Sequence, residues 1–440
     1  MADKFFDVAV IAEGLNALLA AYELSKGDVS IAVIDNYKPS LTIDGYDFNY
    51  YPEHLFAPHE LPGIFQELHV AFEVYTSPAY QMILPDRRID MHCNVQKLLK
   101  AVGLRFADGP ARLEEYLYKE QRICDLLSQG TGASAGGHTG RPERPLSRLL
   151  RKELLRKESR SADRSLGDLK GPGPVSVFIS AIERFMAPWL SGRGPSAHRA
   201  IAPLLLRKRF YPVGGKGSLK AALINELAKR NVNIIQGEGV TSIEHGRYFT
   251  TTFAHEQTVR SRRLIVEPIY EKTASLLPSG PYGGIKKRFY VDNIFIGLRR
   301  SCLPGPYGRV NSAVMVCDYD RPPENDNLIF MDTNPLTDIK RAKDEMAALT
   351  ATLLITENSI SRISSIRHAA IERIRWFMPF FDGCVENVYF TEPSIVWDGG
   401  RTPVYKKGLM LINDEFINLY TGDEKYAYIK KQAERLVKTL

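Results

Sequence analysis

The first 35 residues form the pattern that most limits what this chain can fold into. Phe5–Ile11 is a short apolar run, typical of a strand that is buried on both faces. Leu15–Lys26, rich in leucine and alanine, predicts a helix, and Val29–Ile34 predicts a second buried strand that ends at Asp35. This order predicts a parallel βαβ unit, since a helix is the usual crossover between two parallel strands.

The turn between the first strand and the helix has the features of a dinucleotide site. A helix N-terminus attracts a pyrophosphate, Gly14 allows the backbone to approach it, and Asp35 would accept hydrogen bonds from the ribose hydroxyls. Ala12 and Ala17 replace the other two glycines of a full motif, and Glu13 would repel the pyrophosphate unless its side chain points away. From these residues alone, a dinucleotide site and a βαβ unit that binds nothing both remain open.

Composition indicates a globular protein with more than one domain. The 440 residues are too many for one compact core, and 44% of them are hydrophobic and 25% charged. No run approaches 18 apolar residues, and the N-terminus lacks the basic start and apolar middle of a signal peptide, so we expect a cytoplasmic protein. The five cysteines are scattered without a Cys-x-x-Cys pair, which predicts reduced thiols: Cys93, Cys124, Cys302, Cys317 and Cys384.

Four further segments follow the order and spacing of one superfamily. They are residues 45–55, the Pro-x-Gly-Gly segment Phe210–Lys220, residues 257–277, and Gly408–Asp414. Together with the βαβ unit, they resemble the phytoene-desaturase-like and amine-oxidase-like FAD oxidoreductases. That superfamily also includes the Rab GDP-dissociation inhibitors and escort proteins, which share the fold, bind no flavin and have a lipid-modified protein partner. The resemblance covers nearly the whole chain.

The resemblance implies an α/β fold in which a Rossmann-type FAD-binding domain is assembled from discontinuous segments and a mixed α+β substrate domain fills the intervals. The FAD-binding domain would comprise residues 1–95, 205–275 and 395–440, and the substrate domain residues 96–204 and 276–394, with a basic flexible insertion at about 126–175.

The resemblance also implies which residues contact FAD. The backbone of Val240 would touch the adenine end, while Asn413 and Asp414 stand where the family has a Gly-Asp pair that meets the ribityl chain and pyrophosphate. The chain departs from the family by lacking Gly-Gly-Arg after Asp35 and by carrying asparagine at position 413. The full set of expected cofactor-binding residues is Ala12, Gly14, Leu15, Asp35, Val240, Asn413 and Asp414.

The insertion carries most of the net positive charge of the chain. Residues 141–170 contain ten Lys or Arg against five Asp or Glu, compared with a formal net charge of +7 for the whole chain. Within Leu146–Lys157, leucines recur at helical spacing between basic residues, which suits a peripheral contact with an anionic membrane or an acidic protein partner. A solvated helix whose leucines pack on its own domain is the interpretation we favour. Nothing in the segment predicts a nucleic-acid-binding fold.

No catalytic residue can be named from the sequence. His54 and His59 have no third residue at metal-ligand spacing, so we expect no metal site. Lys216 and Lys220 could steer an anionic cofactor, although exposed lysines are usually only solvated. Several aromatic residues could line an apolar substrate tunnel or simply form core: Tyr50, Tyr51, Phe380, Phe381, Tyr389, Phe390 and Trp397.

Two hypotheses about function follow. The first is an FAD-dependent oxidoreductase of the desaturase or dehydrogenase type, which transfers hydride from a hydrophobic, polyene-like or lipid-like small molecule to the flavin. The second is a flavin-free scaffold of the same fold that binds a protein partner or a lipid group. Glu13, the missing Gly-Gly-Arg and the segment Leu264–Tyr270, which resembles the dissociation inhibitors, favour the second. Taken as a whole, the sequence favours the first.

Overall fold

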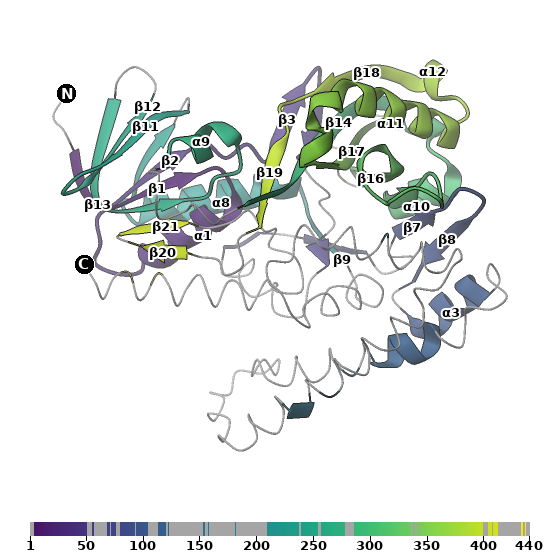
Figure 1. The fold of residues 1–440 in the computed structure, drawn as a ribbon, viewed down its shortest axis with the longest axis horizontal. Helices are drawn as coiled ribbons and strands as arrows, with labels where there is room; N and C mark the ends of the chain where they lie inside the picture. Colours follow the sequence, from purple (N-terminus) through teal and green to yellow (C-terminus); the bar gives the residue numbers. More distant parts are fainter. Residues whose placement is uncertain are drawn as a thin grey trace.

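The protein consists of two β-sheet lobes that lie side by side. In the computed structural model, Figure 1 shows one sheet with helices α1 and α8 on the left and a second sheet with α11 on the right. The structure describes residues 4–50, 68–103, 113–119, 209–277, 286–398 and 404–411, with short gaps, together with Leu55–Phe56 and a few isolated positions.

The first sheet has eight strands and contains the predicted βαβ unit, which is confirmed. Strands β10, β2, β1, β13, β12 and β11 lie in this order, β21 pairs with β13, and β20 pairs with β21. The bounds are β1 Lys4–Ala12, β2 Ile31–Asp35, β10 Asn233–Gln236, β11 Val240–His245, β12 Phe249–Phe253, β13 Gln257–Val266, β20 Val404–Lys406 and β21 Leu409–Leu411.

The central strands of this sheet are parallel, so their carboxyl ends meet at one edge. Strand β1 pairs in parallel with both β2 and β13, with Ala12 opposite Asp35 and Ile11 opposite Val266. The ladder continues one residue beyond β13, where the Glu267 N–H donates to the Ile11 carbonyl at 3.2 Å. The pairing therefore places the turn after β1, Asp35 and Glu267 at the same edge of the sheet.

Helices α1 (Leu15–Leu24) and α8 (Gly215–Lys229) pack on this sheet and on each other. Helix α8 begins within the Pro-x-Gly-Gly segment, at Gly215. Gly214 and Gly215 both adopt positive φ, a conformation that favours glycine, and they turn the chain directly into the helix. The Gly214 N–H also donates to the Asp338 carboxylate at 2.9 Å, which ties the Pro-x-Gly-Gly segment to the second lobe.

The second sheet also has eight strands, in the order β18, β14, β17, β16, β15, β7, β8, with β19 paired to β14. Its central strand β17 is buried on both faces, and α11 (Ile363–Phe377) covers one face with Ile366, Ala370, Ile374 and Phe377. The other bounds are β7 Tyr80–Ile83, β8 Arg88–Met91, β14 Lys286–Arg299, β15 Ser312–Val316, β16 Leu328–Thr333, β17 Met346–Thr356, β18 Val385–Phe390 and β19 Ser394–Asp398.

Smaller elements connect the two lobes. Hairpin β3–β4 packs on the second sheet through Tyr46 and Phe48, and β9 pairs with β5 and β6. These elements and the remaining helices are β3 Ser40–Ile43, β4 Tyr46–Asn49, β5 Leu55–Phe56, β6 Phe72–Tyr75, β9 Arg209–Pro212, α3 Val95–Gly103, α9 Glu271–Ser275, η3 Arg300–Cys302, α10 Gly305–Val310, η4 Asn325–Asn327, η6 Glu357–Arg362 and α12 Phe381–Cys384.

The predicted division into domains differs from the strand pairing in two places. Residues 395–398 of β19 were assigned to the first domain, yet β19 pairs with β14 of the second sheet. Strands β7 and β8 lie within residues 1–95, which the sequence assigned to the first domain, yet they extend the second sheet through pairing of β7 with β15. Exposed and buried residues alternate over Arg88–Met91. This alternation does not show which sheet the strands join, because pairing with either sheet would bury the same side chains.

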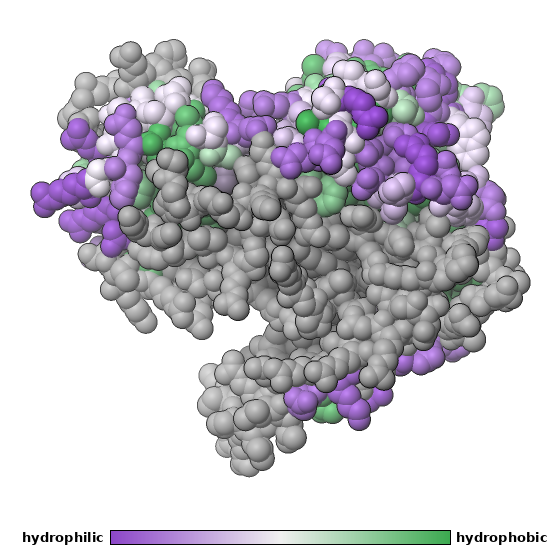
Figure 2. Space-filling view, in the orientation of Figure 1, coloured by the Kyte–Doolittle hydropathy of each residue, from purple (hydrophilic) through white to green (hydrophobic). Residues whose placement is uncertain are grey.

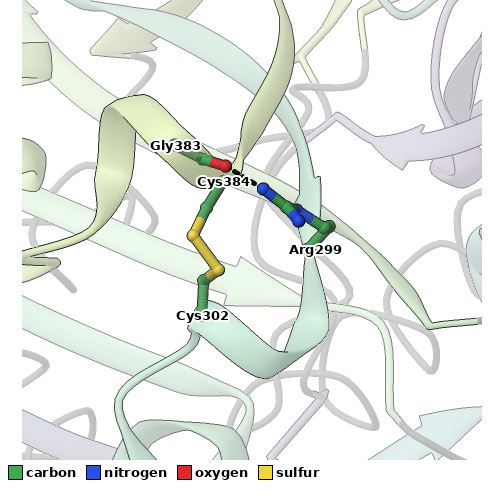
Figure 3. Close-up of a disulfide and its surroundings, with 4 residues drawn as sticks. All are labelled: Arg299, Cys302, Gly383 and Cys384. Atoms are coloured by element: carbon green, nitrogen blue, oxygen red, sulfur yellow. Dashed lines mark hydrogen bonds between the residues drawn. A yellow bond between two sulfur atoms is a disulfide. The ribbon is translucent and has the colours of Figure 1, made fainter.

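The cysteine prediction is wrong for one pair. Cys302 and Cys384 form a disulfide with their Cα atoms 6.1 Å apart (Figure 3). The two residues are separated by 82 positions, and only the folded arrangement of η3 against α12 brings them together. Cys317 is free, while Cys93 and Cys124 lie outside the described residues.

The described surface is mostly polar on the face that Figure 2 shows. Figure 2 shows hydrophilic residues over most of the visible described surface of both lobes, with smaller hydrophobic areas between them. Among the described residues, no helix has the length and apolar character needed to span a bilayer.

Candidate functional site

The N-terminus of α1, where the sequence predicts a pyrophosphate, already holds a carboxylate of the protein. The Ala17 N–H donates to Glu267 Oε2 at 2.7 Å, and the Asn16 side-chain amide donates to Oε1 at 2.9 Å. Glu267 is fully buried. An acceptor on the third N–H of a helix is the role of an N-cap side chain, and a negative charge there is favoured by the helix dipole. Glu267 thus supplies from a distant segment the cap that Gly14 lacks.

Gly14 is required by this contact. A Cβ atom at position 14 would lie 2.6 Å from Glu267 Oε1 and 2.7 Å from its carboxyl carbon, both closer than real Cβ contacts allow. The backbone of Gly14 is extended, with φ −146° and ψ 179°, so its conformation would suit any residue. The glycine therefore makes room for an approaching anionic group, as the motif predicts, but that group is the side chain of Glu267.

Glu13 points away from the α1 N-terminus and caps a different helix. Its Oε2 accepts hydrogen bonds from the Ile269 N–H at 2.9 Å and the Tyr270 N–H at 3.1 Å, and its Oε1 accepts one from the Thr273 hydroxyl. These donors belong to the first turn of α9 and the residues before it. The two carboxylates thus cross: Glu13 from the β1 turn binds α9, and Glu267 from the β13 end binds α1.

Burial raises the pKa of Glu13 to about 6 from 4.5, against the opposing hydrogen bonds from Thr273, Tyr270 and Ile269. Between pH 4.5 and about pH 6, Glu13 is protonated in the folded protein and ionised in the unfolded chain. The free energy of unfolding should therefore fall as the pH rises. We expect Glu13 to lower the free energy of unfolding by about 2 kcal/mol from pH 4.5 to pH 7. Urea titrations across this range should show the loss in wild type and its absence in Glu13→Gln. An unchanged pH dependence in the variant would contradict the assignment.

Asp35, the expected ribose-binding carboxylate, also has internal partners. It is buried at the end of β2, where its Oδ2 lies 2.9 Å from Lys220 Nζ and its Oδ1 accepts the Tyr37 N–H at 3.2 Å. Lys220 additionally donates to the Tyr37 carbonyl, and Lys216 donates to the Tyr50 carbonyl at 3.4 Å. The lysine considered as a guide for an anionic cofactor therefore neutralises Asp35 instead.

Two of the other expected cofactor residues, Ala12 and Leu15, lie at the same edge. Ala12 ends β1 outside the left-handed region, so its methyl group strains nothing, and Leu15 begins α1. Val240 is buried at the start of β11, in one hydrophobic cluster with Ile11. Asn413 and Asp414 lie outside the described residues.

The described aromatic residues that could line a tunnel or form core do not all lie together. Phe381 is buried in the core beneath α11, whereas Phe380 and Phe390 are 74% and 43% exposed. Tyr50 and Tyr389 do pack in one cluster, around Phe48 and Phe295. These aromatics occupy three different environments, so they do not form a single lining.

Other predictions fall on residues that the structure does not describe. They are the loop histidines His54 and His59, Tyr51, and all of Leu146–Lys157 except Glu153, Leu154 and Lys157, which are helical and exposed. The side chain of Trp397 is also outside the description, although its backbone lies in β19. Among the described residues, no group of His, Cys, Asp and Glu could hold a metal ion.

Sequence reasoning missed Glu267 as a site residue. Its position directly after a buried strand and before Pro268 was visible, within the segment that resembles the dissociation inhibitors. What the sequence did not show is that β13 pairs next to β1, which brings a residue 253 positions away into contact with Gly14.

The groups that would hold the ADP half of FAD are thus satisfied within the chain. The α1 N–H of Ala17 binds Glu267, and the Asp35 carboxylate binds Lys220. A pyrophosphate placed at α1 would have to displace a buried carboxylate and would meet its negative charge. In this conformation the residues present do not fit a dinucleotide.

Comparison with solved structures shows the fold. Wild-type putrescine oxidase bound to putrescine matches with a TM-score of 0.58 at 15% identity, over 99% of this chain and 100% of the other. Cyclohexylamine oxidase from Brevibacterium oxydans matches with a TM-score of 0.57 at 11% identity, over 99% of each chain. A Rab GDI from Plasmodium falciparum matches with a TM-score of 0.59 at 10% identity, over 99% and 98%.

These matches confirm the predicted fold class, which the amine oxidases and the Rab GDI share. None of these three structures is a phytoene desaturase. No protein-family model and no curated protein matches the chain.

Proposed function

We propose that this protein is a flavin-free binding scaffold built on the fold shared by amine oxidases and Rab GDP-dissociation inhibitors. The observation that supports this proposal is the carboxylate of Glu267 on the α1 N-terminus, 2.7 Å from the Ala17 nitrogen. In a flavoprotein of this fold, the same N–H groups would receive the pyrophosphate of FAD. The chain keeps the architecture while an internal anion takes the ligand's place.

The ion pair at Asp35 supports the same proposal independently. A free carboxylate at the end of β2 would select a ribose hydroxyl, but this one is buried with Lys220 at 2.9 Å. Binding FAD would therefore break two buried polar contacts. Each broken contact leaves a desolvated partner, at a cost of about 1–3 kcal/mol.

A protein partner, a lipid group or both would be the ligand of such a scaffold, as the resemblance to the Rab GDP-dissociation inhibitors implies. Binding of a lipid-modified protein and of its unmodified form can be compared by gel filtration. Stronger retention of the modified form would identify the lipid as part of the recognised ligand, and equal retention would assign recognition to the protein surface.

The test of the proposal is flavin binding by the purified protein. We expect a colourless protein that acquires no visible flavin absorption after incubation with excess FAD and gel filtration, because both anchoring groups have internal partners. Putrescine oxidase stripped of its flavin and reconstituted in parallel serves as the positive control. We also expect no hydrogen peroxide from putrescine or cyclohexylamine in the presence of FAD. Stoichiometric flavin that remains with the protein would overturn the proposal.

An FAD-dependent oxidoreductase is the second candidate, favoured by the fold of the two amine oxidases. In that case Glu267 would have to leave the α1 N-terminus when FAD binds, and Lys220 would have to release Asp35 to the ribose. The protein would then supply orientation and exclusion of water around a flavin that accepts the hydride. Flavin retention in the same experiment would select this candidate.

A further inference from the structure

The second lobe carries an exposed aromatic pair that the proposed function does not use. Trp376 at the end of α11 and Phe380 before α12 are 63% and 74% exposed, whereas Phe377, Met378 and Phe381 between and beside them are buried. We call Trp376, Pro379 and Phe380 the aromatic tip. Large apolar side chains that are exposed together at one place often mark an interaction surface.

The backbone beneath the aromatic tip is held firmly. The disulfide joins Cys384 to Cys302, and the Arg299 guanidinium donates to the Gly383 carbonyl, as Figure 3 shows. Arg375 Nε donates to Asp382 at 2.9 Å, and the Phe381 N–H donates to the Met378 carbonyl at 2.9 Å. Because the backbone of this turn is already ordered, burying its two aromatic side chains in a partner loses little backbone conformational entropy.

The charges around the aromatic tip favour an anionic partner. The carboxylates beside it, Glu372 and Asp382, both pair with Arg375. Arg373 is exposed on the last turns of α11. The guanidinium carbon of Arg88 lies 4.7 Å from the centroid of the Phe377 ring, and Arg299 donates to the Gly383 carbonyl at the disulfide-bonded base. These residues carry four positive charges against two negative ones.

The geometry indicates a bilayer surface as the partner. Exposures of 63% and 74% mean that the two rings project from a turn and do not line a groove. Tryptophan and phenylalanine projecting beside arginines suit the interface of an anionic membrane, where rings enter the headgroup region and guanidinium groups remain with the phosphates. We propose that the aromatic tip docks the protein on anionic lipid bilayers. The proposal does not depend on whether the protein binds FAD.

The test is vesicle flotation of the full-length protein. We expect flotation with phosphatidylcholine vesicles that contain phosphatidylserine and weaker flotation with phosphatidylcholine alone. Trp376→Ser/Phe380→Ser should bind about tenfold more weakly. Both residues are exposed, so thermal unfolding should be unchanged.

The matched control is a second exposed aromatic pair with neighbouring arginines. Phe5 and Tyr248, 44% and 37% exposed, contact each other with ring centroids 4.9 Å apart. Arg262 and Arg247 lie against these rings. Phe5→Ser/Tyr248→Ser should float like wild type. Equal loss in both double variants would overturn the proposal, because it would indicate non-specific adsorption of exposed rings.

Three further outcomes would also overturn it. They are a wild-type protein that does not float, flotation that survives the Trp376→Ser/Phe380→Ser change, and conversion of a dimer to a monomer by that change. The second outcome would assign membrane contact to another segment, such as Leu146–Lys157, and the third would make the tip a contact between two copies of the chain. Brominated lipid should quench the tryptophan fluorescence of wild type more than that of Trp376→Phe, which retains the two other tryptophans.

Discussion

Glu267→Ala should lower the free energy of unfolding by about 2–4 kcal/mol, because it leaves two buried donors without their acceptor. The donors are the Ala17 N–H and the Asn16 side-chain amide, at 2.7 and 2.9 Å from the carboxylate. The helix dipole of α1 also loses the negative charge that it favours. Urea denaturation of wild type and variant at neutral pH measures the difference.

The same variant should acquire an anion site that wild type lacks. With the carboxylate gone, the α1 N-terminus has free donors and room beside Gly14, which suits a phosphate. Inorganic phosphate or ADP should therefore raise the melting temperature of Glu267→Ala by ligand linkage and leave that of wild type unchanged. Glu244→Ala, an exposed glutamate on β11, is the control for loss of a carboxylate. A neutral effect of Glu267→Ala on stability, or equal stabilisation of wild type by ADP, would contradict the internal-anion assignment.

Breaking the Cys302–Cys384 disulfide should lower the free energy of unfolding by about 2–5 kcal/mol, because the intact bond closes a long loop in the unfolded chain. The loop spans 82 positions and includes β15, β16, β17 and α11, so three strands of the second sheet and the helix that covers it lie between the two cysteines. The measurement is urea denaturation of Cys302→Ser under non-reducing conditions.

Replacing either cysteine, replacing both, or reducing the bond should lower the free energy of unfolding by the same amount. Cys302→Ser, Cys384→Ser and the double variant should lose the same stability within error, and a reductant should bring wild type to their level without affecting them further. If the single variants differ widely, packing of the serine side chains and not loss of the bond would account for the effect. Wild type that is insensitive to the reductant would show that the thiols are not bonded in solution.

The local pattern of the sequence was sufficient for the first lobe's framework. Apolar runs of strand length around a leucine- and alanine-rich helix predicted β1, α1 and β2, because burial on both faces requires continuous apolar residues in a parallel sheet. Residues 257–277, one of the segments that carry the family resemblance, contain β13 over 257–266 and α9 over 271–275. The turn into α8 was not predicted, since the sequence did not show that Gly214 and Gly215 adopt positive φ and lead directly into the helix.

The sequence by itself therefore determined that a strand-turn-helix unit opens this chain, that Gly14 admits an anion to the helix and that Asp35 ends the next strand. Only the tertiary structure decided which anion this is. The order of strands in a sheet depends on long-range pairing that no local pattern encodes, and here β13 lies beside β1. That pairing brings Glu267 to the α1 N-terminus, as the packing of η3 and α12 brings Cys302 to Cys384.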